Sequence, residues 1–553
     1  MALNRGWWVA FVLAPVAVLG EGTARADSVA LPHGVHLTST GRYIQDVCDH
    51  DQRFYCMAHR LLPATYKPGD SIEEALHLHP AAGSQGMGPT DVASGYYLPA
   101  GSASNGKIVA VLDMPDSNAL SDLNVYRQQY GLSALSACGG SGLPTGSGAP
   151  CFASVDESGG SVNQNIGDSG QNDGETGLDL DMISAACPDC SVLLVQFTQP
   201  SDQDFITGAA TAARLGAVAT SISWGGGEGG DPTGYTTPGH LVLAAAGDGG
   251  WQGGSYPASS PDVLAIGGTT LSGPGQEVVW NDGSRGGSTG SGCSTEFPMP
   301  AYQTAYGASK FAGCTMRDMN DLSAAAESTI NGGGIAEYDT ADGGWSVVVG
   351  TSAATPMVAA IFARLGLTDA ISADFGFIYT HASAFNDITS GNNGSCGNIQ
   401  CAAGAGWDGP TGIGTPNGGM LASLGSGSSS SSSGSSSGSG SGSGSGSSSG
   451  GSSGGSSGGG SGGGSGGGSG GGSGGSSGGG SGGSTATPDD GGSSGGGGDA
   501  GTSNGDALPG SGSSSGCGCA TVGASSSAVE GLGIFALGGA ATVLARRRRR
   551  AGK

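Results

Sequence analysis

Ser352 is the residue of this sequence best placed to act as a nucleophile. It follows Gly350 and Thr351 and stands just before the apolar stretch 358–365, which predicts a helix. Small neighbours leave its hydroxyl uncrowded, and the partial positive charge at a helix N-terminus favours a developing negative charge. Most serines before helices are only N-caps, so the motif alone leaves both interpretations open.

A serine nucleophile needs a base, and the sequence offers carboxylates rather than a histidine. Six of the eight histidines precede the regular pattern of strands and helices, and His240 and His381 lie in no recognisable motif. Glu175 and Asp179 are four residues apart, so a helix would place both on one face. Like charges at this spacing repel, which a surface tolerates and a buried pair resolves by sharing a proton. Without further information, a solvated acidic helix end is the commoner explanation.

A third candidate, Asp248, ends the apolar strand predicted at 241–246 and stands between Gly247 and Gly249. Aspartate in a glycine-rich turn is usually turn chemistry. A protonated Asp248 at the end of a buried strand could instead donate a hydrogen bond to an oxyanion.

The elements that must position these residues follow a regular alternation. Short apolar stretches that predict buried strands alternate with helical stretches, which is typical of a parallel sheet covered on both faces. The expected strands are 108–112, 191–197, 217–224, 241–246 and 263–266, and the expected helices include 122–130 and 208–215. We therefore predict an α/β fold in a single catalytic domain at 86–424, preceded by an extension at 27–85 for which the sequence indicates no function.

Composition excludes several classes of function. The chain has 553 residues and a formal charge of -25, and without segments 1–26 and 546–553 it has 11 basic and 43 acidic residues. A body with about -32 charges is a poor ligand for nucleic acid or anionic lipid. Segment 425–516 is almost entirely Gly and Ser, which cannot bury a core, and is predicted to be a flexible linker.

Both ends of the chain indicate export. Segment 1–26 has Arg5, an apolar run and Ala24-Arg25-Ala26, the pattern of a secretory signal peptide. Segment 517–553 has Cys517 and Cys519, a mostly apolar stretch and five arginines, and it resembles the MYXO-CTERM type of surface-sorting tail. An ordinary C-terminal membrane helix is the alternative. The expected location is the cell surface, or outside the cell after processing of the tail.

The twelve cysteines occur as close pairs, which favours disulfides in an oxidising compartment without fixing their connectivity. The pairs are 48/56, 138/151, 187/190, 293/314, 396/401 and 517/519.

Six motifs occur in one order between 107 and 418, and together they resemble the sedolisin family of serine-carboxyl peptidases. They are GETGLDLDMISAACPDC, SISWGGGE, AAAGDGG, YPASSPDVLAIGGT, GTSAATPMVAA, and FNDITSGNNGSC followed by GWDGPTGIGTPNG. The resemblance implies a subtilisin-like fold in which Ser352 is the nucleophile, Glu175 the general base and acid, Asp179 its orienting partner and Asp248 the oxyanion donor. It also implies protein or peptide substrates, an acidic pH optimum and a monomeric catalytic domain.

The resemblance further implies one structural calcium ion in the C-terminal loops. The matching positions are Asp387, Asp408 and the backbone carbonyls of Ile388, Gly404 and Gly406. Two carboxylates with backbone carbonyls suit a hard cation, although Asp-Gly loops are otherwise ordinary turns.

The chain departs from the family in its N-terminal region, because extension 27–85 is too short for a full pro-domain. Either it does a reduced version of that job or the protein is not a conventional zymogen. Two alternatives remain open at this point: a catalytically silent surface-binding or adhesion module, and a conventional Asp-His-Ser subtilisin relative, which the absence of a suitable His-Gly helix motif disfavours.

Overall fold

The computed structural model describes residues 31–78, 85–101, 104–140, 142–160, 173–197, 199–229, 234–283 and 287–425. The predicted signal peptide, the linker beyond Gly425 and the C-terminal tail lie outside the described residues. Within the described ranges, no helix has both the length and the apolar character needed to span a bilayer.

The centre of the fold is a nine-stranded sheet in which β15 alone runs antiparallel to its neighbour. Eight strands follow the order β15 (Gln276–Val279), β14 (Leu264–Gly273), β11 (Leu241–Ala245), β9 (Ala217–Ile222), β5 (Ile108–Asp113), β8 (Ser191–Gln196), β7 (Cys151–Asp156), β6 (Ser136–Ala137), and β18 (Leu322–Ser328) pairs with β14. The predicted α/β class, a parallel sheet flanked by helices, is confirmed.

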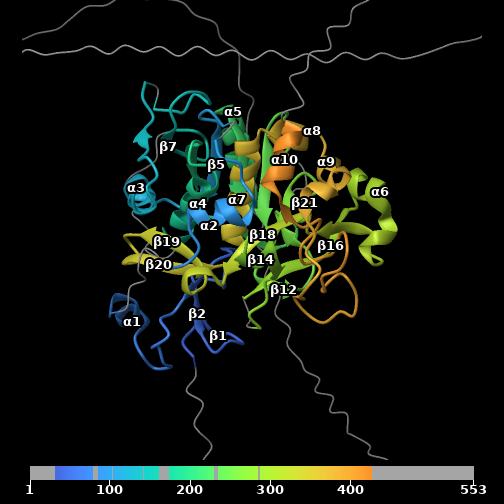
Figure 1. Ribbon diagram of the computed structural model, residues 1–553, viewed down its shortest axis with the longest axis horizontal. Helices are drawn as coiled ribbons and strands as arrows, with labels where there is room; N and C mark the ends of the chain where they lie inside the picture. The colour runs from blue at the N-terminus through green and yellow to red at the C-terminus, as the bar shows by residue number, and fades with distance from the viewer. Residues whose placement is uncertain are drawn as a thin grey trace, which may run out of the picture. The chain divides into compact units, whose positions relative to one another are not determined.

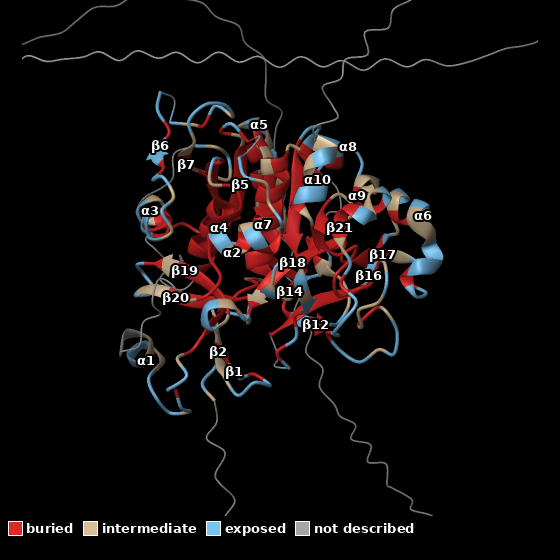
Figure 2. Cartoon of the chain, in the orientation of Figure 1, coloured by how far each residue is buried: buried red, intermediate tan, exposed pale blue. Residues whose placement is uncertain are grey.

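Alternate side chains of the buried strands reach the two faces, as the period of a strand requires. In β5, Val109 and Val111 pack with α4 (Asp173–Ala186) and α7 (Thr351–Leu365), whereas Ala110 and Leu112 pack with α5 (Asp202–Arg214) on the other face. The central strands, α4 and α7 are buried, and exposed residues gather at the periphery (Figure 2). The remaining helices are α1 (Ile72–Leu78), α2 (Pro89–Gly95), α3 (Ala119–Gln129), α6 (Ala301–Gly307), α8 (Thr368–Ala373), α9 (Gly376–Thr380) and α10 (Gly418–Gly425).

Several predicted elements have different bounds in the structure: the helix predicted at 122–130 is α3 (Ala119–Gln129), and the strand predicted at 263–266 is the longer β14. Helix α5 begins at Asp202, earlier than predicted, because the Ser201 hydroxyl caps it by accepting the Asp204 N–H at 3.2 Å. The strand predicted at 217–224 is interrupted at Ser223: β9 stays in the main sheet and β10 (Trp224–Gly227) leaves it.

The N-terminal extension contributes strands to two smaller sheets that it shares with the body. One sheet has the order β1 (Val35–Leu37), β2 (Tyr43–Asp46), β4 (His59–Leu61), β20 (Gly344–Val349), β19 (Ile335–Asp339). In Figure 1 the blue strands β1 and β2 lie below the yellow strands β19 and β20, and β4 joins the two groups by pairing with β2 and β20. The other sheet has the order β13 (Ser255–Tyr256), β10, β3 (Phe54–Cys56).

Two further small sheets complete the described fold. They are β12 (Gly249–Trp251), β16 (Ser288–Pro298), β17 (Met316–Met319), and the pair β21 (Phe385–Asn386), β22 (Thr415–Pro416).

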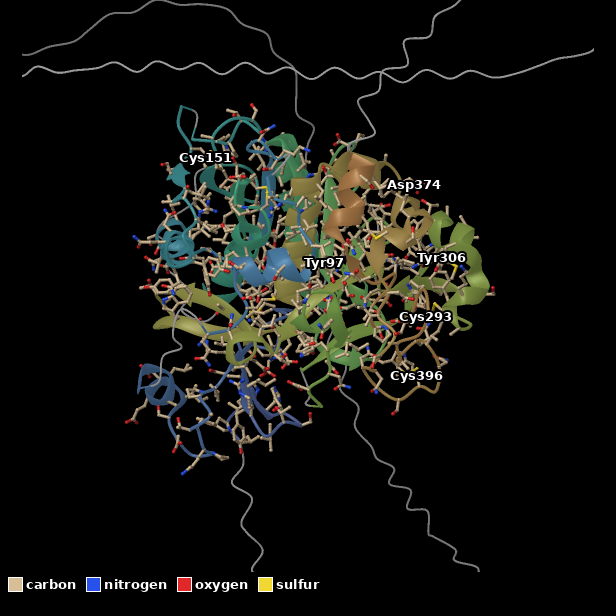
Figure 3. All side chains as sticks on the ribbon, in the orientation of Figure 1. Tyr97, Cys151, Cys293, Tyr306, Asp374 and Cys396 are labelled. Atoms are coloured by element: carbon tan, nitrogen blue, oxygen red, sulfur yellow. A yellow bond between two sulfur atoms is a disulfide. The ribbon has the colours of Figure 1, made fainter. Side chains whose placement is uncertain are left out.

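Five of the six predicted cysteine pairs are disulfides in the structure, and the pair 517/519 lies outside the described residues. The bonded pairs are 48/56, 138/151, 187/190, 293/314 and 396/401. Cys151, Cys293 and Cys396 lie toward the margin of the fold (Figure 3). The disulfides thus close local loops, with sequence separations from 3 to 21 residues.

Candidate active site

Ser352 lies in the first turn of α7 and is completely buried. Gly350, with φ 149°, turns the chain from β20 into this helix, and a Cβ there would lie 2.1 Å from the Met57 carbonyl oxygen. The Ser352 hydroxyl donates to the Ser223 carbonyl oxygen at 3.2 Å and accepts the Met57 N–H at 3.1 Å. The structure therefore places the candidate nucleophile at a helix N-terminus, as the sequence predicts, against a segment of the N-terminal extension.

Glu175 and Asp179 lie on one face of α4, as their spacing predicts, but neither side chain is exposed. The interpretation as a solvated helix end is therefore wrong. Burial raises the pKa of Glu175 well above its ordinary value and repulsion from Asp179 adds to this, while the neighbouring Ser352 hydroxyl lowers it. Neither Glu175 oxygen has a well-formed hydrogen bond to a described residue. An unpaired, buried carboxyl beside a serine hydroxyl is suited to exchange a proton with it.

Asp113 joins this pair, and sequence reasoning did not select it. Ligand oxygens of Asp113, Glu175 and Asp179 lie within 4.8 Å of one another. Burial raises the pKa of Asp113 to about 7, against hydrogen bonds from the Met114 N–H at 2.8 Å and Trp224 Nε1 at 2.9 Å. Its place at the carboxyl end of a predicted parallel strand was the available signal, because such ends commonly carry functional side chains.

Asp179 is held by a hydroxyl rather than by a cation. The Ser223 hydroxyl donates to its Oδ1 at 2.7 Å, and burial raises its pKa well above the ordinary range. Because Asp113, Glu175 and Asp179 are buried together, they cannot all ionise, and a proton shared among them is the physical resolution.

Asp248 follows β11 and contacts Thr351, the first residue of α7. Its Oδ1 accepts the Thr351 N–H at 2.9 Å and the Thr351 hydroxyl at 2.7 Å. Burial raises the pKa of Asp248, and the interaction with His59 opposes this. Its Oδ2 lies 3.3 Å from His59 Nε2, so a proton on Oδ2 would reach an oxyanion only in place of that contact.

His59, on β4 of the N-terminal extension, is the histidine that the structure brings to this site. Its Nε2 lies 3.3 Å from Asp248 Oδ2, and its Nδ1 lies 2.8 Å from Asp46 Oδ1. Burial alone would lower its pKa, but hydrogen bonds to Asp248 and Asp46 raise it to about 9. His59 therefore contacts the candidate oxyanion donor, whereas the hydrogen bonds of Ser352 Oγ involve no histidine. Sequence reasoning missed this contact because 189 residues separate the partners.

The predicted calcium ligands meet in one loop region. Asp387 Oδ2 accepts the Gly406 N–H at 3.0 Å, and Asp408 Oδ2 accepts the Gly404 N–H at 3.0 Å. Burial raises the pKa of Asp408 to about 7, and the nearby Asp387 carboxylate adds to the shift. Oxygen donors with closely placed carboxylates fit a hard divalent cation in kind and charge.

The sequence of this chain is similar to those of known serine peptidases. The sequence model of Peptidase_S8, the subtilase family, matches residues 161–368. Kumamolisin of Bacillus sp. (strain MN-32) is 32% identical over 367 residues, which cover 60% of this chain and 62% of that protein. Sedolisin of Pseudomonas sp. (strain 101) is 35% identical over 183 residues, 30% of each chain.

Among solved structures, Pseudomonas sedolisin complexed with two molecules of pseudo-iodotyrostatin has a TM-score of 0.48 and 22% identity, covering 62% of this chain and 98% of that one. The chain spans less than two thirds of the length of the curated relatives named above. The sequence similarities support the prediction that it is a serine-carboxyl peptidase.

Proposed function

We propose that this protein is a serine endopeptidase that hydrolyses peptide bonds in protein or peptide substrates. The observation that supports it is the convergence of Ser352, the buried Glu175–Asp179 pair and Asp248 from α7, α4 and the end of β11. Each residue has an environment that supports its role: a hydroxyl at a helix N-terminus, a proton-sharing base and a carboxyl that burial helps to keep protonated.

The proposed reaction has two halves. Ser352 Oγ attacks the carbonyl carbon of the substrate and gives its proton to Glu175. Asp179 shares the proton that Glu175 has accepted. The oxyanion accepts hydrogen bonds from the Ser352 N–H and from protonated Asp248. The C–N bond then breaks, Glu175 returns the proton to the leaving amine, and water hydrolyses the ester to regenerate Ser352.

The reaction is proposed to run in acid. The Glu175–Asp179 pair must carry one negative charge to accept a proton, whereas Asp248 must keep its own proton. Burial raises the pKa of Glu175, Asp179 and Asp248 alike. A pair that shares one proton ionises in two steps, and the acidic optimum proposed here requires the first step of the Glu175–Asp179 pair to lie below the pKa of Asp248.

The test is hydrolysis of a denatured protein by segment 27–424 from pH 3 to pH 8 with calcium. Ser352→Ala and Glu175→Gln should each abolish an acid-peaked activity, while Ser423→Ala and Glu74→Gln, at exposed positions, should keep it. Activity that rises steadily from pH 5 to pH 8 would contradict the role of Asp248. A folded wild type without hydrolysis would favour the silent binding module.

We also propose that one calcium ion stabilises the C-terminal loops. Asp387 and Asp408 would hold it together with carbonyl oxygens of Ile388, Gly404 and Gly406, and its charge would offset the repulsion between the two carboxylates. The role is structural, because no residue of the candidate active site belongs to this set.

The cellular setting completes the proposal. Segment 1–26 would direct export, and 517–553 would anchor or sort the protein at the cell surface, with 425–516 as a tether. Residues of a Gly/Ser chain span about 5–6 Å times the square root of their number, so the tether would let the catalytic domain work roughly 50–60 Å from its attachment. Detection of the protein on intact cells by surface labelling, lost on deletion of 517–553, would test this.

A further inference from the structure

Strand β3 lies on β10 as an added, antiparallel strand. The paired residues are Trp224 with Cys56, Gly225 with Tyr55, and Gly226 with Phe54. This is the way in which an extended peptide binds to an exposed strand, with main-chain hydrogen bonds for affinity and side-chain pockets for specificity. Strand β10 also directly follows Ser223, whose carbonyl oxygen accepts the Ser352 hydroxyl.

The residue after this strand, Met57, has its peptide group against Ser352. Its N–H donates to the Ser223 carbonyl oxygen at 3.0 Å, continuing the strand pairing. Its carbonyl oxygen accepts the Ser352 N–H at 3.0 Å, at the N-terminus of α7. A carbonyl held by that N–H, next to the Ser352 hydroxyl, occupies the place of a carbonyl about to be attacked.

Two side chains of the segment fill built pockets. Met57 is buried against the backbone of two glycines: a Cβ on Gly225 would lie 2.9 Å from its Cε, and a Cβ on Gly247 would lie 3.9 Å from it. Phe54 is buried three residues earlier, edge-on to Phe205 at 5.3 Å between ring centroids and tilted against Tyr256 at 6.2 Å. One pocket thus admits a long unbranched side chain, and the other an aromatic ring.

The same segment also contacts the second half of the site, because His59 lies beside Asp248. The segment 54–59 therefore touches both the candidate nucleophile and the candidate oxyanion donor. A loop that merely covered the surface would not align a carbonyl, a strand and two side chains with these groups.

We propose that segment 54–58 is the chain's own first substrate, that Met57–Ala58 is the bond presented to Ser352, and that the pockets of Met57 and Phe54 define the preferred class of peptide. That class has an unbranched apolar residue before the cut and an aromatic residue three positions earlier. This inference rests on the proposed function and deepens it.

Cleavage of this bond follows the same steps as the hydrolysis of other substrates. Ser352 Oγ bonds to the Met57 carbonyl carbon, the bond to the Ala58 nitrogen breaks, and the proton taken by Glu175 passes to that nitrogen. Water then hydrolyses the ester, which leaves a carboxylate on Met57 and an amino group on Ala58. Because the disulfide Cys48–Cys56 lies wholly upstream, none of the described disulfides joins the two products.

The experiment measures where the chain cuts itself. Segment 27–424 is held in acid with calcium, and its products are identified by intact mass and N-terminal sequencing. The wild type should yield a new N-terminus at Ala58 without reduction of disulfides. Met57→Asp should slow this cut at least about 10-fold, because the backbone of Gly225 and Gly247 lines the Met57 pocket and a carboxylate would be buried there. Met57→Leu should retain the cut. Ser352→Ala should not cut, and Met420→Asp, at an exposed methionine, should cut like the wild type.

A second measurement does not depend on catalysis. In Ser352→Ala, amide hydrogen exchange of 54–57 should be slowed by at least about 100-fold relative to an unstructured peptide, since these residues are paired with β10. Exchange at the unstructured rate would overturn the inference whatever the activity. Hydrolysis of an added denatured protein with Met57–Ala58 intact would overturn the inference and leave the proposed function standing. Hydrolysis of neither would overturn both.

Discussion

Replacing Asp248 separates its two proposed properties, hydrogen-bond donation and titration. Its Oδ1 is occupied by the N–H and hydroxyl of Thr351, so Oδ2, which lies 3.3 Å from His59 Nε2, is the atom left to donate to an oxyanion. In Asp248→Asn, the amide oxygen can keep the bonds to Thr351 while the NH2 group donates at every pH. In Asp248→Ala, both the donor and the acceptor are lost.

The expected magnitudes follow from the donor count. Loss of one oxyanion donor typically lowers kcat by about 10²–10³, or about 2.7–4 kcal/mol, and Asp248→Ala should fall in this range. Asp248→Asn should lose less, because it keeps a donor. In the wild type, activity requires protonated Asp248, so it is present below the pKa of that group and lost as pH rises through it. The asparagine variant should lack this alkaline limb.

The assay is kcat and KM for an internally quenched peptide between pH 3 and pH 8, with Ser352→Ala as the background rate. The reasoning would be refuted by an asparagine variant with the alkaline limb of the wild type. An alanine variant within about three-fold of wild-type kcat would refute it equally, since one donor is worth far more than that.

Three further predictions concern stability and the support of the base. Burial raises the pKa of Asp318 to about 7, so its stabilisation is full below about pH 4 and lost as pH rises toward 7, roughly 4 kcal/mol in all. Asp318→Asn should therefore flatten the fall in unfolding free energy measured by urea at pH 4 and pH 7, and an unchanged fall would contradict this. Calcium at about 100 times its Kd should stabilise the wild type by about 2.7 kcal/mol and Asp408→Asn by much less, measured as Tm with and without a chelator; equal shifts would exclude Asp408 as a ligand. Trp224→Phe removes the indole N–H that donates to Asp113, so the pKa of that carboxyl should rise and the acid limb of the kcat–pH profile should move to higher pH. A pH profile identical to that of the wild type would show that Trp224 does not influence the general base.

Local motifs were sufficient to predict the positions of Ser352 and Asp248, because each depends on residues adjacent in the chain. Glycine before Ser352 and the strand before Asp248 fix their backbones directly. The spacing of Glu175 and Asp179 predicted a common helix face but could not decide its burial, since what covers α4 comes from distant segments. Asp113 was missed for the same reason: its significance lies in the neighbours that the parallel sheet gives it.

In the N-terminal extension, hydrophobic periodicity could not predict the strands. Strands β1, β3 and β4 have three residues each, too few for an alternating pattern to emerge. Their conformation is decided by partners such as β10 and β20, which lie far along the chain. The six early histidines therefore showed no motif, although three of them, His36, His50 and His59, gather around Asp46 in the structure.

If the proposed function holds, the departure of β10 from the main sheet would require an extended substrate. Strand β10 is paired with β13 on one side and with β3 on the other. If β3 is the first substrate, its departure leaves the N–H and C=O groups of Trp224 and Gly226 without a partner strand, at an edge that leads directly to Ser223 and Ser352. Unpaired backbone groups are satisfied by another strand, and a folded protein rarely offers a free one. On this proposal, the same geometry that presents Met57–Ala58 to Ser352 would select unfolded or flexible chains for later turnovers.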